Sequence, residues 1–436
     1  MEPPIRVLHS VPEPLGLFFR PSRNDHHVLS QFLSEDRTGM SGVVFDAEHV
    51  GRQEELRAEV SHRNLEALLD PRLMELATLS GFTERRRALP WGGDRPHLLS
   101  DLAGRRGQTI VEVLADFVVA NGSTAVLAPT HFLAEGIRDP WLALDLDLTR
   151  RLRDRLDLRG ATDVAIYYPL AMSTKLFFDS AQRHMLTSAL RGLGIDGLWL
   201  RIHPFGADSG HLTLRRYIAA CRDMHNLSVP LIAERTGNVG LALLGFGAVG
   251  GIESGVSSGD KFGFGRLSRK PLQQKPFAPP PRVYVPALGG FLPRQDASEF
   301  LKSRTARASF ACRNTACCRR GADDMLANAR RHFVFTRLEE VRLLGSVPAT
   351  DRAEHYLNSL LRPASDKFGK ALQLADHSSL KEKLERQRLR LDDWRHTLGE
   401  MARIPGSTFS PVPFRRVRRQ RGQGVVSTSG GEISHV

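Results

Sequence analysis

Three of the four cysteines in the chain lie between positions 312 and 318. They are Cys312, Cys317 and Cys318, and His332 follows in the next apolar helical run. Thiolates and an imidazole at this spacing suit a closed tetrahedral zinc site. Clustered thiols are also more often metal ligands than disulfides in a reducing compartment. We therefore expect one structural zinc ion in a Cys3His site, with buried or reactive thiols as the alternative.

Polar residues close a series of short apolar runs along the chain. Among them, Asp46, Glu234 and Glu253 carry carboxylates that could act as nucleophile, acid or base. Neighbouring polar side chains could hold a substrate, an oxyanion or a phosphate. Those expected to bind substrate are Asp70, His131, Arg201, His203, Arg235, Asp260 and Lys261. The alternative for each is that it merely begins a loop. The glycine- and serine-rich segment 250–259 could cradle a phosphate or a planar base, or be a flexible surface loop.

The apolar runs alternate with amphipathic stretches of helical length. Such alternation is typical of parallel strands connected by crossover helices. Eight runs are present, which is the number that closes a (β/α)8 barrel, the TIM barrel. They span 15–20, 42–46, 65–70, 124–129, 164–168, 197–203, 229–234 and 247–253. An open doubly wound sheet is disfavoured, because no Gly-x-Gly-x-x-Gly follows the first run and the polar ends are spread over nearly all runs.

Helices are expected between these runs, and glycines mark several of their ends. The clearest helical patterns cover 110–119, 146–156, 181–190 and 212–224. Gly122, Gly160 and Gly194 stand where a left-handed helix cap is required. In a barrel of this type the active site lies at the carboxyl ends of the strands. The polar residues that close the runs should therefore face one rim.

Beyond the barrel, assigned to 1–275, the chain changes character. Segment 276–345 holds a proline-rich linker (276–281), a strand (283–288), a helix (295–302) and the Cys/His region. Helices are expected over about 325–345, 351–361 and 378–402, and the last has charge spacing suited to a coiled-coil arm and a homodimer. We assign 346–403 to these C-terminal helices. The remaining 404–436 is expected to be a disordered basic tail.

The chain carries a formal net charge of +13 and a sequence pI near 10.1. This surplus favours an anionic partner such as RNA or DNA, and arginines at 415–421 would suit phosphate contacts. The competing explanation is a coding bias toward arginine. No apolar stretch approaches the roughly 20 residues of a membrane helix, and no signal pattern opens the sequence. The expectation is a cytoplasmic protein with no membrane partner.

A barrel followed by a Cys3His site and further helices resembles the tRNA-guanine (queuine) transglycosylase superfamily, which includes relatives that modify DNA. The resemblance covers the layout of residues 15–345. It implies an aspartate nucleophile that attacks the ribose C1′, a second aspartate active in base exchange, and a structural zinc ion. The cysteine spacing here differs from the family pattern, and only Asp46 and Glu253 stand near the family's aspartate motifs.

Three functions follow as hypotheses. The first is glycosyl transfer or base exchange on a nucleic acid or nucleoside, with Asp46 or Glu253 as nucleophile and the other as acid or base. Arg201, His203 and Arg235 would then hold the substrate. The second is a barrel hydrolase or lyase acting on a small anionic metabolite. The third is a non-catalytic nucleic-acid-binding scaffold.

Overall fold

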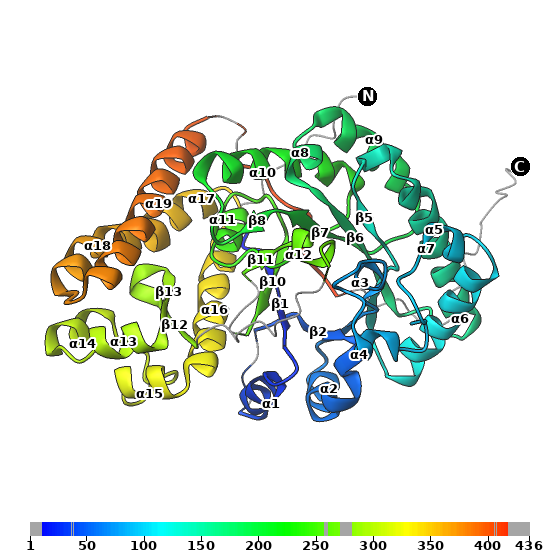
Figure 1. Ribbon diagram of the computed structural model, residues 1–436. Coiled ribbons are helices and arrows are strands. Elements are labelled where there is room, and N and C mark those ends of the chain that lie inside the picture. The colour runs from blue at the N-terminus through cyan, green and yellow to red at the C-terminus, as the bar shows by residue number, and fades with distance from the viewer. Residues whose placement is uncertain are drawn as a thin grey trace, which may run out of the picture.

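Eight parallel strands close into a barrel in the computed structural model (Figure 1). The model describes residues 11–35, 37, 39–256, 260–270, 281–404, 406 and 408–416. Each barrel strand pairs with the next along the chain, and the β10–β1 and β4–β6 pairings complete the ring. The barrel strands are β1 (Gly16–Arg20), β2 (Gly42–Asp46), β3 (Glu66–Asp70), β4 (Ala125–Leu127), β6 (Ala165–Ser173), β7 (Gly197–His203), β9 (Leu231–Ala233) and β10 (Gly251–Gly255). The predicted (β/α)8 fold is confirmed.

The eight expected strands are all present, and the last begins later than the sequence pattern suggests. Residues 247–250 were expected to be extended, but Gly247 has a φ of +67° and turns the chain after helix α11. Glycine adopts this conformation without the steric cost that a side chain would bring. Strand β10 therefore starts at Gly251, and Glu253 lies within it.

Helices surround the barrel, and the expected glycine caps at 122, 160 and 194 all have positive φ. The ring helices are α1 (His26–Ser34), α2 (Glu54–His62), α6 (Arg105–Ala120), α7 (Pro140–Leu158), α9 (Ser180–Leu190), α10 (His211–Met224) and α11 (Val239–Gly245). Shorter elements are α3 (Leu73–Leu76), α4 (Glu84–Arg87), α5 (Leu99–Leu102), β5 (Phe132–Leu133), α8 (Thr174–Phe177), β8 (Phe205–Gly206), β11 (Lys261–Phe262) and α12 (Phe264–Leu267).

The ring is completed by a helix from beyond residue 275. Helix α16 (Ala329–Gly345) packs against both α11 and α1. It follows the hairpin β12 (Arg282–Val285) and β13 (Gly290–Pro293), and helices α13 (Arg294–Phe300), α14 (Arg304–Phe310) and α15 (Ala322–Ala327). The Cys/His region is therefore built into the barrel wall. One hydrophobic core runs from the barrel helices into this segment.

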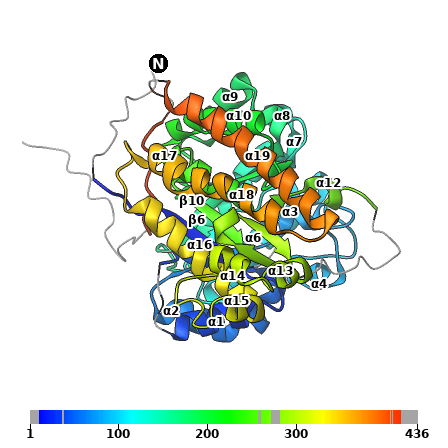
Figure 2. The same ribbon diagram turned by 90° about the vertical axis from the view of Figure 1, so that its left-hand side faces the viewer.

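The C-terminal helices lie together along one side of the barrel (Figure 2). They are α17 (Arg352–His355), a π-helical turn (Tyr356–Leu361), α18 (Arg362–Leu374) and α19 (Ser378–Ala402). The apolar side of α19, including Leu384, Trp394 and Leu398, is buried against α10 and α18 of the same chain. The face expected to form a coiled-coil arm is thus used inside the chain.

The barrel interior is filled from both ends. Its apolar layer contains Phe18, Tyr167 and Trp199, and it also receives Phe414 from the C-terminal segment. The Phe414 ring meets that of Phe18 edge-on with centroids 5.0 Å apart. We expected everything from 404 onward to stand outside the core, and residues 408–416 correct this. The Phe414 ring fills an apolar space at the floor of the barrel, although the segment that carries it has no helical or strand periodicity.

Some expected features fall on residues outside the described ranges. These are 276–280 of the linker, 257–259 of the glycine-rich loop and 417–436 of the tail. Among the helices that are described, none has the length and apolar character to cross a bilayer.

Candidate functional site

The centre of the barrel mouth is occupied by the guanidinium of Arg20, at the end of β1. Its Nε and Nη2 donate to Glu253 at 3.0 and 2.9 Å, and Nη1 donates to Asp70 at 2.7 Å. Nη1 also contacts Asp46, and Nη2 lies 3.5 Å from Glu234. Asp46 and Asp70 end β2 and β3, Glu234 follows β9, and Glu253 lies in the middle of β10. The parallel strands bring them together because their carboxyl ends meet at one rim.

A second buried arginine joins two of these carboxylates from the opposite wall. Arg201 on β7 donates through Nε to Glu234 at 2.6 Å and through Nη2 to Asp70. The Trp199 indole donates to the same Glu234 oxygen at 2.9 Å. One oxygen of Asp70 and one oxygen of Glu234 are therefore each paired with the guanidinium groups of both Arg20 and Arg201.

Two further arginines lie at the same rim in left-handed backbone conformations. Arg72 has a φ of +62° and Arg235 a φ of +52°. Arg72 lies 3.5 Å from both Asp46 and Asp70, and the Nε of Arg235 lies 3.6 Å from Glu234. Left-handed backbone at non-glycine residues is uncommon and often accompanies functional sites.

The pKa values of Asp46 and Glu253, the two carboxyl groups expected to take part in the reaction, are shifted in opposite directions. Burial alone would raise the pKa of Asp46, but the charges of Arg72 and Arg20 outweigh it and lower that pKa. The pKa of Glu253 is raised, because burial outweighs the charge of Arg20 and Glu234 adds a negative charge nearby. Two carboxyl groups with pKa values pushed apart can divide the roles of nucleophile and acid.

Access to solvent distinguishes Asp46 from the other three carboxylates. Its side chain is 12% exposed, whereas those of Asp70, Glu234 and Glu253 are at most 2% exposed. Asp46 faces a mouth pocket of about 740 Å³, whose floor also includes Arg20 and Glu253. A substrate in the mouth pocket would therefore meet Asp46 first.

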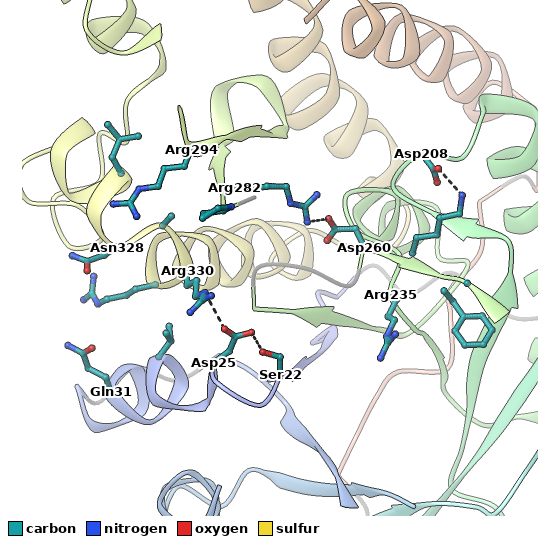
Figure 3. A pocket seen from close by; sticks show the side chains of 18 of the residues that line it. Ser22, Asp25, Gln31, Asp208, Arg235, Asp260, Arg282, Arg294, Asn328 and Arg330 are labelled. Carbon is teal, nitrogen blue, oxygen red and sulfur yellow. Dashed lines mark hydrogen bonds and ion pairs between the residues drawn. The ribbon is translucent and has the colours of Figure 1, made fainter. Parts of the chain in front are cut away.

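Beside the mouth pocket lies a larger cleft of about 1730 Å³, lined by residues of the barrel mouth and of the Cys/His region (Figure 3). Both spaces share Arg72 and Arg235. On the barrel side the cleft is lined by His203, Asp260 and Lys261. Among the described residues that line it, basic side chains outnumber acidic ones: Arg37, Arg72, Arg235, Lys261, Arg266, Arg269, Arg282, Arg294, Arg319, Arg330 and Arg331, against Asp25, Glu35, Glu75, Asp208, Asp260 and Asp324.

The four expected metal ligands converge. The donor atoms of Cys312, Cys317, Cys318 and His332 all lie within 4.8 Å of one another. The Cys317 and Cys318 sulfurs are 3.6 Å apart, and they lie 3.3 and 3.4 Å from Nδ1 of His332. Tetrahedral coordination with Zn–S near 2.3 Å and Zn–N near 2.0 Å implies donor separations of about 3.5–3.8 Å. The set could hold a metal ion, as the sequence predicted.

Contacts around this Cys/His site fix both the ligands and the cleft. Nε2 of His332 lies 3.1 Å from the Tyr284 carbonyl oxygen, which leaves Nδ1 for a metal. Arg331 donates to the Cys317 carbonyl oxygen at 2.8 Å and pairs at 2.6 Å with Glu35, the residue that follows α1. The Cys/His site thus anchors the wall of the cleft that faces α1.

The residues predicted to act in catalysis or substrate binding divide into three groups. Asp46, Asp70, Glu234, Glu253 and Arg201 meet in one network, and Arg235, His203, Asp260 and Lys261 lie at the mouth pocket or the cleft.

His131 does not join them. It is buried behind the strands, where Nδ1 lies 2.6 Å from Asp145 of α7 and the ring stacks on Trp141. Sequence reasoning assigned no role to Arg20 or Arg72, although Arg20 closes the first apolar run and carried the same signal as the residues chosen.

No protein-family model and no curated protein matches the sequence. Among solved structures, the chain is similar in fold to a thiamine phosphate pyrophosphorylase from Pyrococcus furiosus. The identity is 11% and the TM-score 0.29, over 56% of this chain and 88% of that one.

Proposed function

We propose that this protein is a transferase that acts on a nucleic acid at the barrel mouth, exchanging or transferring a base at the sugar C1′. The observation that carries the proposal is a basic cleft that leads to one accessible ionised carboxylate, Asp46, beside the buried carboxyl of Glu253. The polyanion would bind in the cleft, and a single nucleotide would enter the mouth pocket. This agrees with the resemblance to tRNA-guanine transglycosylases.

The two carboxyl groups would share the reaction. The Asp46 carboxylate attacks C1′ and forms a C–O bond while the glycosidic C–N bond breaks. The departing base takes a proton from Glu253, whose raised pKa favours the protonated form. An incoming base then attacks C1′, returns a proton to Glu253 and releases Asp46. No oxidant or other reactant is required.

The remaining residues would bind or position. Arg235, His203 and Lys261 line the path of the substrate and could contact its phosphates. Arg201 is buried and pairs with Asp70 and Glu234. It therefore acts as a positioning residue that fixes the carboxylate network.

The metal in this proposal is one structural zinc ion. Three thiolates with one imidazole are a ligand set that zinc prefers, and four protein ligands leave no open position for substrate. Zinc would hold the wall that carries Arg319, Arg330 and Arg331.

The experiment is a base-exchange assay with radiolabelled guanine and either transfer RNA or single-stranded DNA. The wild type should incorporate label into one of them, and Asp46→Asn should lose incorporation. A covalent protein–nucleic acid adduct should appear on denaturing gels of the wild type and be absent from Asp46→Asn. The matched control is Asp147→Asn on the outside of α7, where the carboxylate is 43% exposed. Exchange that survives in Asp46→Asn contradicts the proposal.

A second candidate is a nucleic-acid-binding scaffold without catalysis. It is favoured by one observation: each of the four carboxylates at the mouth is already paired with Arg20. Salt-sensitive binding of nucleic acid with no exchange of any base would support the scaffold over the transferase.

A further inference from the structure

Arg23 and Arg85 line the rim of the mouth pocket from two separate elements, and a third arginine, Arg52, lies close enough for its charge to lower the pKa of Arg23. Arg23 lies in the loop between β1 and α1, Arg52 ends the 3-10 helix that follows β2, and Arg85 lies on α4. Arg23 and Arg85 line the mouth pocket but not the cleft, so this rim is distinct from the wall formed by the Cys/His region. We refer to Arg23, Arg52 and Arg85 as the rim triad.

The rim triad has no acidic partner in the part of the chain that the structure describes. None of its three side chains makes an ion pair or hydrogen bond with any described residue. Two other arginines of the same pocket behave differently, since Arg72 pairs with Glu75 at 2.8 Å and Arg86 with Glu48 at 2.8 Å. The charges of Arg52 and then Arg85 lower the pKa of Arg23. Such like-charge crowding opposes folding, so packing gives no reason for it.

The chemistry of the rim triad fits one kind of ligand. Guanidinium groups bind phosphate oxygens through paired N–H donors. Three of them converging from separate elements can surround a phosphate group that neither α4 nor the loop after β1 could hold alone. A phosphate bound there would also remove the mutual repulsion.

We propose that Arg23, Arg52 and Arg85 form a phosphate-binding site at the rim of the mouth pocket. The proposal rests on the proposed function in one respect: the phosphate is taken to belong to the nucleic acid whose neighbouring phosphates lie in the cleft. The strand would then run from the cleft to the mouth pocket, with one phosphate held at the rim triad near the nucleotide that faces Asp46.

Acidic residues near the rim triad affect how strongly it can bind a phosphate. Glu48 is committed to Arg86 and Arg72. Glu84 precedes Arg85 on α4, is exposed and lines the mouth pocket. Its charge would oppose an anion, so Glu84→Gln should tighten phosphate binding.

Calorimetric titration with inorganic pyrophosphate tests the site directly. To reduce binding elsewhere, the titration uses a background in which the cleft arginines Arg266, Arg294 and Arg319 are changed to glutamine. This background should bind pyrophosphate, and adding Arg23→Gln, Arg52→Gln and Arg85→Gln should weaken binding by about tenfold or more.

The matched control adds Arg150→Gln, Arg191→Gln and Arg216→Gln instead, three exposed arginines that line neither space. It should bind pyrophosphate as the background does. Loss of the rim triad should not lower the melting temperature, because it removes only repulsion. Equal pyrophosphate binding with and without the rim triad, or none in the background, overturns the site.

A second measurement separates a nucleic acid phosphate from a free one. With a fluorescent single-stranded oligonucleotide, the slope of log affinity against log salt should fall by about 0.7 when the rim triad alone is changed, because the triad is proposed to hold one phosphate and each phosphate contributes roughly 0.7. An unchanged slope, with pyrophosphate binding still dependent on the rim triad, overturns the assignment to nucleic acid. Pyrophosphate binding at the rim triad would stand even if no base exchange were found.

Discussion

Asp46 and Glu253 contact the same guanidinium group, that of Arg20, through different nitrogens. The two carboxyl groups therefore lie close enough to act on one substrate. Arg20 is also 5% exposed and has four carboxylates around it. It is the residue on which the geometry of the barrel mouth depends.

Replacing Arg20 with glutamine should destabilise the fold by about 3–5 kcal/mol at pH 7, because buried carboxylates lose their counter-charge. Without Arg20, burial would raise the pKa values of Asp46 and Glu253 in the folded state. A group whose pKa is higher in the folded than in the unfolded state lowers the free energy of unfolding as pH rises. The stability lost in Arg20→Gln should therefore be smaller at pH 4.5 than at pH 7. Urea unfolding of the wild type and of Arg20→Gln at both pH values measures this loss.

The control for that experiment is Arg159→Gln, which breaks an exposed pair with Asp116 and should cost less than about 1 kcal/mol. A loss for Arg20→Gln that is equal at the two pH values would contradict the buried-charge account.

Elemental analysis of purified protein should find about one zinc per chain. Cys317→Ser should lose zinc and melt at a lower temperature, since structural zinc sites contribute directly to folding. Cys221→Ser is the matched control, because Cys221 is buried on α10 away from the cluster. Metal retained by Cys317→Ser, or absent from the wild type, would refute the site.

A buried pair at the floor of the barrel should make stability depend on pH. Burial raises the pKa of Glu66 to about 7, although the Tyr167 hydroxyl donates to it. With its folded pKa above the unfolded value near 4.5, Glu66 should cost stability as pH rises to 7, by up to about 3 kcal/mol. Glu66→Gln should therefore match the wild type at pH 4 and exceed its free energy of unfolding at pH 8. An advantage of equal size at both pH values would show that ionisation of Glu66 is not the cause.

The two parts of the C-terminal segment should have different roles, one in stability and the other in nucleic acid binding. Phe414→Ala should cost about 3–5 kcal/mol, because Phe414 fills the barrel floor. Deleting 417–436 should leave the melting temperature unchanged and reduce the salt dependence of nucleic acid binding, since Arg418, Arg419 and Arg421 are removed. A stable Phe414→Ala variant, or a lower melting temperature after the deletion, would contradict this division.

The fold was predictable because each βα unit carries its own signal. Alternating apolar runs and helical stretches indicate eight strands even without pairing information. The metal ligands were predictable for a similar reason, since Cys312, Cys317 and Cys318 are close in sequence and His332 lies in the first turn of the next apolar helix, α16.

Other features depend on closure of the barrel. Arg20 and Arg201 meet the same carboxylates only after β1 and β7 face each other across it. The last ring helix, α16, arrives from beyond residue 275, and Phe414 reaches the floor from a segment without periodicity. His131 was wrongly predicted to bind substrate. A polar residue near the end of a strand can also turn away from the barrel mouth, and His131 does so and pairs with Asp145.

Binding of nucleic acid in the basic cleft can be measured by fluorescence anisotropy of a labelled single-stranded oligonucleotide between about 50 and 200 mM salt. We expect binding at about 50 mM that weakens steeply as salt rises. Arg266→Gln, Arg294→Gln and Arg319→Gln together should weaken binding and lower the salt slope by about 2, whereas changing Arg150, Arg191 and Arg216 should not. Absence of binding by the wild type at about 50 mM salt would contradict the account, and the small anionic metabolite would then be the better hypothesis for the substrate.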